Sequence, residues 1–377
     1  MKKKGGGLKT IRIVAADDSA VMRGLLTRMF ATEQAGAMAP MQLCATVPDG
    51  ASCLHAVRTL HPDVVLLDLH MPGLGGLEAI VRLRQEWPCL PIIMCSAATA
   101  DGAAATLEAL AKGASDYVTK PAGAMDAVAA IEALWGQLAP RICALAGRCD
   151  RVGLPVRRSG MTTRLRGVKV EAVGIGVSTG GPAALERLLT GLPEDFPVPV
   201  LVVQHMPKLF TSALVSRLDR CCAMRVRQAA AGVVLKPGTI WIAPGESHIE
   251  VKMGPHGVPC VGLREGGEVQ RCGPAVDVLF RSMAEVFGSG ALGLVLTGMG
   301  ADGVAGARAI VEAGGSVMAQ DEASSVVWGM PGRVVAAGLA QAVLPLDRLG
   351  RELVAMSSVG RCRRVVTAEM ETRYECC

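Results

Sequence analysis

The sequence predicts an α/β protein with two doubly wound domains, each built on a mostly parallel sheet. Short apolar runs alternate with amphipathic segments from Ile11 to about Ala139, and the alternation starts again at Val168, as expected for parallel strands joined by helices. The intervening segment, 140–167, loses this periodicity and gains Arg, Gly and Pro, which is typical of a linker. The chain length of 377 residues allows each domain its own core.

In the first domain, 11–139, four apolar runs predict strands, and apolar residues recur at helical spacing between them. These runs are Ile11–Ala16, Val64–Leu67, Pro91–Cys95 and Tyr117–Val118. Residues 1–10 precede the first run, and we expect them to form a flexible N-terminus.

In the second domain, 168–357, we expect strands at Val168–Val177, Val198–Val203, Ala291–Leu296 and Ser316–Ala319, with helices at Ala183–Leu192 and Val304–Ala313. The stretch Arg225–Val269 is rich in Gly and Pro and alternates at Thr239–Ala243, which predicts inserted antiparallel strands. Residues 358–377 form a tail of unknown role.

The composition indicates a cytoplasmic protein without membrane insertion. Half of the residues are apolar, but no run of about 18 lacks charged or helix-breaking residues. The basic start, Met1–Lys4, is followed by glycines and charges instead of an apolar core, so we do not expect export. The 13 cysteines are scattered without a Cys-x-x-Cys pair, which favours reduced thiols over zinc ligands.

The mild net charge of +5 is densest around the predicted linker. The stretch from Arg141 to Arg166 holds seven arginines and a single acid, Asp150. A nucleic-acid contact and a solvated basic linker are both open for such a stretch. Aromatic residues make up only 3% of the chain, and none falls between Trp135 and Phe196. We therefore favour the linker and expect no nucleic-acid partner.

Polar residues follow the predicted strands of the first domain. Asp17 and Asp18 follow the first run, Asp68 the second, Ser96 the next and Lys120 the last. The carboxyl ends of parallel strands meet at one sheet edge, so we expect these residues to converge. Clustered carboxylates favour Mg²⁺, and a carboxylate beside it can take a phosphoryl group that a lysine and a hydroxyl bind. Alternatively, each residue serves only locally, as a helix cap or a surface lysine.

Together with Tyr117 and the pairs Met71-Pro72 and Lys120-Pro121, these residues resemble the receiver domain of two-component response regulators. The resemblance implies a doubly wound (βα)5 fold and a histidine kinase as phosphodonor. The site residues it implies are Asp68 as the phosphorylated residue, Asp17, Asp18 and Asp68 as Mg²⁺ ligands, Ser96 and Lys120 as phosphoryl contacts, and Tyr117 as the aromatic that reorients on phosphorylation.

A serine, a histidine and an aspartate each follow a predicted strand of the second domain. Ser178 lies in a small-residue turn before Pro182, His205 directly follows a strand, and Asp302 lies in a glycine-rich turn. These are the residue types of an acyl-transfer triad. Ser178 and Asp302 could instead cap helices, and the glycines around Ser178 could form a dinucleotide loop, although their spacing departs from G-x-G-x-x-G.

Further residues of the second domain extend this hypothesis. Backbone N–H groups near Thr179 and Met299 are candidates for an oxyanion hole. His248 follows a turn and could lie near the site, whereas His256 is interpreted as a loop histidine.

The second domain, from about Val168 to Leu346, resembles the catalytic domain of chemotaxis protein-glutamate methylesterases. The similar stretches are Gly176–Pro182, Val203–Met206, Ile242–Gly245 with His248, Leu296–Gly306 and Gly329–Pro331. By this resemblance Ser178, His205 and Asp302 are catalytic, in a doubly wound, mostly parallel α/β domain that needs no cofactor for hydrolysis.

The resemblance implies a phosphorylation-activated hydrolase in chemotaxis adaptation. It would demethylate glutamate γ-methyl esters on the cytoplasmic helices of methyl-accepting chemoreceptors and also deamidate receptor glutamines. The unphosphorylated receiver domain would cover the Ser178 edge. A different class stays open, namely a response regulator whose second domain binds a partner without hydrolysis.

Overall fold

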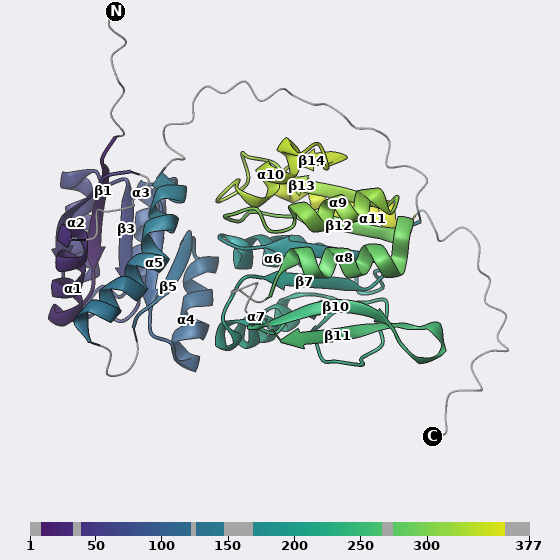
Figure 1. Cartoon of the computed structure of the whole chain (residues 1–377). Helices are drawn as coiled ribbons and strands as arrows, with labels where there is room; N and C mark the ends of the chain where they lie inside the picture. The colour runs from purple at the N-terminus through teal and green to yellow at the C-terminus, as the bar shows by residue number, and fades with distance from the viewer. Residues whose placement is uncertain (1–8, 33–38, 122–125, 147–168, 266–273, 359–377) are drawn as a thin grey trace, which may run out of the picture.

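The computed structural model describes residues 9–32, 39–121, 126–146, 169–265 and 274–358. They form two α/β domains that lie side by side (Figure 1). The predicted linker after residue 146, the first eight residues of the predicted N-terminus and the tail after residue 358 lie outside the described residues.

The first domain is a parallel sheet with the strand order β2-β1-β3-β4-β5. Helices α1 and α5 cover one face, and α2, α3 and α4 cover the other, which confirms the doubly wound fold. The strands are β1 (Ile11–Ala16), β2 (Met41–Val47), β3 (Val64–Asp68), β4 (Ile92–Ser96) and β5 (Asp116–Thr119). The helices are α1 (Ala20–Thr32), α2 (Gly50–Leu60), α3 (Gly76–Glu86), α4 (Ala100–Ala111) and α5 (Ala127–Ala146).

Two elements of the first domain differ from the prediction. Strand β2 was missed because it is an edge strand in which only Met41 is buried, so it lacks the continuous apolar run of its neighbours. Helix α5 continues to Ala146, although the sequence predicted a linker from Pro140 onward. Pro140 lies inside the helix, and Ile142 and Leu145 extend its buried face beyond the proline.

Helix α5 is also the one described helix that is long and apolar enough to cross a membrane by length and composition. Its buried residues Ile131, Leu134 and Leu138 pack against β1 and α1 in the core of the first domain. Packing in that domain therefore accounts for the apolar residues on the buried face of the helix.

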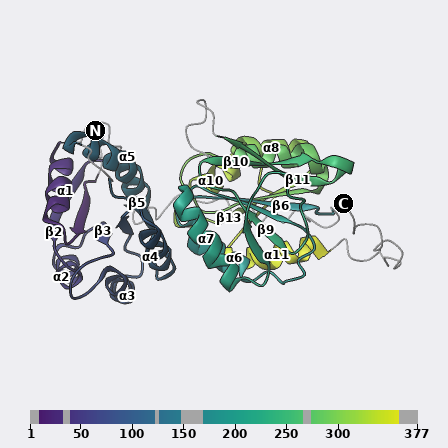
Figure 2. The ribbon, with the colours of Figure 1, turned by 90° about the horizontal axis from the view of Figure 1, so that it is seen from below.

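The second domain holds a seven-stranded parallel sheet with the order β14-β13-β12-β6-β7-β9-β8. Helices α6, α7 and α11 cover one face, while α8, α9, α10 and the hairpin β10–β11 cover the other (Figure 2). The strands are β6 (Ala172–Val177), β7 (Val200–Gln204), β8 (Arg225–Gln228), β9 (Thr239–Ile242), β10 (Ser247–Met253), β11 (Pro259–Glu265), β12 (Ala291–Val295), β13 (Ser316–Gln320) and β14 (Ala342–Leu344). The helices are α6 (Gly181–Leu189), α7 (Lys208–Cys221), α8 (Val276–Phe287), α9 (Val304–Glu312), α10 (Met330–Ala336) and α11 (Leu346–Ser358), with single turns at Pro255–Gly257 and Gly288–Gly290.

The prediction of antiparallel strands between Arg225 and Val269 is only half right. Strands β10 and β11 are antiparallel, but β9, the segment with the clearest alternation, is parallel to both β7 and β8. Alternation reports that one face of a strand is more buried than the other, and it carries no information on strand direction.

The two domains meet through the β5 edge of the first domain and its helices α4 and α5. Tyr117 of β5 stacks on Phe210 of α7, with ring centroids 4.6 Å apart. Helix α4 lies against α6 and α7, and Val327 joins the apolar cluster around Leu138 and Ile142 of α5. These contacts are made by packed apolar side chains.

Gly174 of β6 shows how closely α8 packs on the second sheet. A Cβ at this position would lie 2.4 Å from Met283 Sδ and 3.1 Å from Phe280 Cε1, and both side chains are fully buried. The sheet therefore requires glycine at this position, because neither neighbour can move into solvent to make room for a side chain.

Gly174→Ala is expected to lower the free energy of unfolding by about 1–3 kcal/mol, since the added methyl overpacks the core. Denaturant unfolding measures the change. Gly350→Ala in α11 is the control, because its Cβ would meet only ordinary contacts at 3.5 Å or more, and it should raise stability by up to about 1 kcal/mol. An unchanged unfolding midpoint for Gly174→Ala would refute the close packing.

Candidate functional site

Ser178 lies in the turn between β6 and α6, where the sequence placed it. Three glycines surround Ser178 closely, two in this turn and Gly298 in the loop after β12. Gly180 has a φ of +76°, a Cβ on Gly181 would lie 1.9 Å from Gln204 Oε1, and a Cβ on Gly298 would lie 2.8 Å from Ser178 Cβ. Pro182 lies in the first turn of α6, as predicted. The serine is thus held half-buried on a rigid turn.

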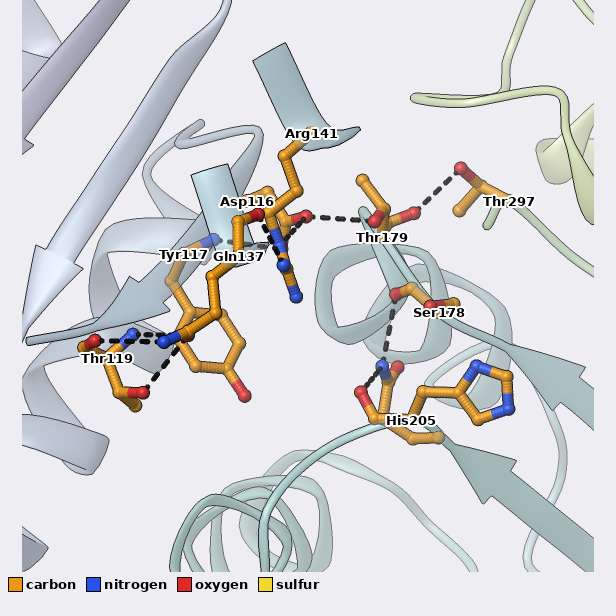
Figure 3. A network of polar contacts seen from close by, with 10 residues as sticks. Asp116, Tyr117, Thr119, Gln137, Arg141, Ser178, Thr179, His205 and Thr297 are labelled. Atoms are coloured by element: carbon orange, nitrogen blue, oxygen red, sulfur yellow. Dashed lines mark hydrogen bonds and ion pairs between the residues drawn. The ribbon is translucent and has the colours of Figure 1, made fainter. Parts of the chain in front are cut away.

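Strand register brings His205 beside Ser178. Val177 pairs with Gln204 across β6 and β7, so the residues that follow the two strands are neighbours. The amide of Gln204 donates to the carbonyls of Ser178 at 3.0 Å and His205 at 3.2 Å. Figure 3 shows the two residues emerging side by side from their strands.

Asp302 reaches the same histidine from the loop after β12. Its Oδ2 lies 2.8 Å from His205 Nε2, and it also accepts the backbone N–H groups of Val276 and Asp277 at the start of α8. Burial alone would raise the pKa of Asp302, but the bonds from His205 and these N–H groups outweigh it and lower the pKa. The carboxylate therefore stays ionised and fixes the imidazole.

The geometry assigns different tasks to the two ring nitrogens of His205. With Nε2 bound to Asp302, Nδ1 is the nitrogen left for a further hydrogen bond. In the part of the chain that the structure describes, no hydrogen bond joins the Ser178 hydroxyl to His205. The pair of His205 and Asp302 is thus assembled, and Ser178 lies beside it without a hydrogen bond from its hydroxyl to His205.

The two predicted oxyanion donors flank Ser178. Among the described residues, neither the backbone N–H of Thr179 nor that of Met299 has a protein acceptor, so both are available to a ligand. The carbonyl of Thr179 accepts the hydroxyl of Thr297 at 2.9 Å, and its own hydroxyl donates to Asp116 of the first domain at 2.8 Å (Figure 3).

Two residues of this site were not singled out from the sequence. Gln204 is buried and ties Ser178 to His205, and its only sequence signal is its place beside the strand-end histidine. Asp116 is a buried carboxylate that pairs with Arg141 at 3.1 Å. A charged residue opening an apolar strand is its only signal, and the sequence does not reveal its partner in the other domain.

The acidic residues predicted from the first domain do converge. Oxygens of Asp17, Asp18 and Asp68 lie within 4.8 Å of one another, and Lys120 Nζ lies 2.8 Å from Asp17 and 2.9 Å from Asp68. Burial raises the pKa of Asp68, although Lys120 opposes the shift. Three carboxylate ligands from two strand ends suit an octahedral oxygen-bound ion, so this donor set fits Mg²⁺.

The other two predicted residues of that site lie differently. The Ser96 hydroxyl, at the end of β4, donates to the carbonyl of Gly102 and accepts from Thr106 at 2.7 Å, so a phosphoryl contact requires it to exchange these partners. The ring of Tyr117 stacks on Phe210 of the second domain.

Comparison with known proteins covers both domains. A family model described as CheB methylesterase matches residues 173–353, and one described as response regulator receiver domain matches residues 13–132. The crystal structure of the CheB methylesterase catalytic domain from Thermotoga maritima is 39% identical and covers 50% of this chain and 100% of its own, with a TM-score of 0.48.

Relatives match nearly the whole chain. Protein-glutamate methylesterase/protein-glutamine glutaminase from Trichodesmium erythraeum is 41% identical over 91% of this chain and 98% of its own length. The protein of the same name from Nocardioides sp. is 43% identical over 91% of this chain and 94% of its own. With both domains matched in one continuous alignment, the chain belongs to the CheB family of receiver-linked protein-glutamate methylesterases.

Proposed function

We propose that this protein hydrolyses glutamate γ-methyl esters on the cytoplasmic helices of methyl-accepting chemoreceptors, in the cytoplasm and as part of chemotaxis adaptation. The observation that carries the proposal is the meeting of Ser178, His205 and Asp302 at one sheet edge, in a chain of this family. This arrangement supports acyl transfer and does not by itself select the receptor.

In the proposed reaction Ser178 Oγ attacks the ester carbonyl while His205 Nδ1 takes its proton. Asp302 stabilises the imidazolium that forms, and His205 then protonates the departing methoxide. The N–H groups of Thr179 and Met299 would bind the oxyanion, which lowers the barrier by roughly 3 kcal/mol per donor. Water then attacks the acyl-enzyme while His205 Nδ1 takes its proton and passes it to the departing Ser178 Oγ. This step releases the glutamate carboxylate and restores the serine.

The same residues suit a second substrate. The side-chain amide of glutamine presents a carbonyl at the same distance from the backbone as the glutamyl ester, and its leaving group is ammonia. The proposed deamidation of receptor glutamines therefore needs no additional catalytic group, only protonation of the leaving nitrogen by His205.

We further propose that a histidine kinase phosphorylates Asp68. Asp17, Asp18 and Asp68 would hold Mg²⁺, which neutralises charge on the phosphoryl group when it is bound. Lys120 already lies 2.9 Å from Asp68 and would bind a phosphoryl oxygen, while Ser96 would have to turn from Gly102 and Thr106.

Phosphorylation would control access to Ser178 through the contact between the domains. The aromatic Tyr117 is stacked on Phe210, three residues after Pro207 at the base of α7, and Asp116 holds Thr179 beside the nucleophile. A receiver domain in this position covers the Ser178 edge. A change at Ser96 and Tyr117 would weaken the docking and expose the site.

Ser178→Ala should reduce methanol release from methylated receptor membranes by about 10³–10⁶-fold, because it removes the nucleophile. Methanol release by His205→Gln should fall nearly as far, since members of a triad act as a unit. Circular dichroism and melting of both variants control for folding. Substantial remaining activity in a folded Ser178→Ala protein would favour the alternative of a binding module or another nucleophile.

Asp68→Ala should abolish stimulation by a small phosphodonor such as acetyl phosphate, which we expect to raise wild-type activity by about 5- to 150-fold, the range of common coupling energies. A shortened protein that begins near Lys169 should match the stimulated wild type without phosphodonor. The docking hypothesis is wrong if the shortened protein is no faster than the unphosphorylated full-length protein.

Removal of divalent metal with EDTA should prevent this stimulation, because the ligands of the proposed ion are also the phosphorylation site. The basal methanol release of the unphosphorylated protein should stay unchanged, since the reaction proposed at Ser178 uses only protein groups. Loss of basal release on EDTA treatment, restored by Mg²⁺, would contradict this division of roles.

A further inference from the structure

The carboxylate of Asp302 is held by the start of helix α8 as much as by its own loop. Oδ2 accepts the N–H of Val276 at 2.7 Å and Oδ1 accepts the N–H of Asp277 at 3.0 Å. Asp277 in turn accepts the N–H groups of Gly303 and Gly306. The orientation of Asp302 toward His205 therefore depends on where the first turn of α8 lies.

His248 fixes that first turn from a different element. It lies on β10, outside the main sheet, and its Nδ1 accepts the N–H of Ala275 at 3.0 Å. Ala275 is the N-cap residue of α8, directly before Val276. A single peptide unit thus separates the hydrogen bond of His248 from the hydrogen bond of Asp302.

The environment of His248 suits an acceptor that stays neutral. The side chain is only 1% exposed, and an Nδ1 that accepts a backbone N–H leaves the ring proton on Nε2. Burial lowers the pKa of His248, and Arg264, its partner across the hairpin on β11, lowers it further. Glu250 on β10 and Asp302 act in the opposite sense without reversing the shift.

We propose that His248 is a positioning residue of the methylesterase reaction. It holds the start of α8 so that Val276 and Asp277 aim the Asp302 carboxylate at His205 Nε2. His248 touches no reacting atom and acts only through Asp302. This inference rests on the proposed function, because it assigns His248 a part in the same reaction.

Ser282 provides a matched control on the same two elements. Its hydroxyl accepts the N–H of Val251 at 2.9 Å, so it forms a second buried hydrogen bond between α8 and β10. It lies on the second turn of α8 and has no bond to Asp302 or its loop among the described contacts. Ser282→Ala therefore weakens the packing of α8 on the hairpin without reaching the carboxylate.

The test measures kcat and KM for methanol release with full-length proteins, all treated with the same small phosphodonor. His248→Leu keeps the volume but offers no acceptor, and kcat should fall about 10- to 100-fold, as for a misplaced catalytic group. KM should stay within about twofold of wild type. His248→Asn places an amide oxygen near the position of Nδ1 and should recover most of kcat, and Ser282→Ala should keep the wild-type kcat.

A double-mutant cycle separates positioning from a general structural role. In an Asp302→Asn background, His248→Leu should lower kcat by less than about twofold, because the carboxylate that His248 positions is absent. A full loss in that background, or a His248→Asn protein as slow as His248→Leu, would overturn the proposal. If His248→Leu unfolds below the assay temperature, His248→Gln replaces it, since its amide lies near Nε2 and misses Ala275.

The design also distinguishes failure of the proposed function. If wild type releases no more methanol than Ser178→Ala, the methylesterase proposal fails, and the same cycle is then run on hydrolysis of p-nitrophenyl acetate dependent on Ser178. There the positioning role predicts the same pattern of losses and recovery, and a loss at His248 that is independent of Asp302 would refute it.

Discussion

The candidate site depends on the register of three parallel strands. Val177 pairs with Gln204 across β6 and β7, and Gly176 pairs with Val295 across β6 and β12, so the loops after all three strands open at one edge. Ser178 and His205 follow their strands at once, whereas Asp302 lies seven residues beyond Val295. Backbone pairing alone therefore places the first two, and the third needs outside support, which the start of α8 supplies.

The contact between the domains places a second constraint on this edge. Asp116 is buried, and burial raises the pKa of its carboxyl against the opposing effect of Arg141. Its bond to the Thr179 hydroxyl links this carboxylate to the residue whose N–H would face an oxyanion. A buried carboxylate needs all its donors. Separation of the domains would remove the Thr179 donor and the Phe210 ring and would admit water to Asp116. Hydration of the carboxylate favours this separation, and the lost apolar contact opposes it. Such a balance would suit the switch proposed above, in which a change at Tyr117 weakens the docking.

Much of the site could be predicted because strand ends in parallel sheets converge, whatever their separation in sequence. Asp17, Asp68 and Lys120 were found in this way, as were Ser178, His205 and Asp302. Asp116 and the role of His248 could not be found, since each acts through a partner from an element with no fixed relation to its own strand. Gln204 could not be found because its only sequence signal is its place beside the strand-end histidine. The edge strand β2 was missed because its largely unburied residues form no continuous apolar run. The continuation of α5 past Pro140 was missed because tertiary packing outweighs the local effect of the proline.

Asp68 and Asp302 both lie at the carboxyl-terminal edge of a parallel sheet, but their carboxyl groups have different surroundings. At Asp302, backbone N–H groups and His205 lower the pKa of the carboxyl, and the bonds to Val276 and Asp277 occupy both oxygens, so the group can orient and stabilise charge but cannot attack. At Asp68, Oδ1 accepts the N–H of Leu69 and Oδ2 pairs with the ammonium of Lys120, which Asp17 shares. Burial without enough fixed donors raises its pKa, and an incompletely satisfied carboxylate is the better nucleophile. The number of fixed donors around each carboxyl thus fits the roles proposed for them, an orienting acid at Asp302 and a phosphorylated residue at Asp68.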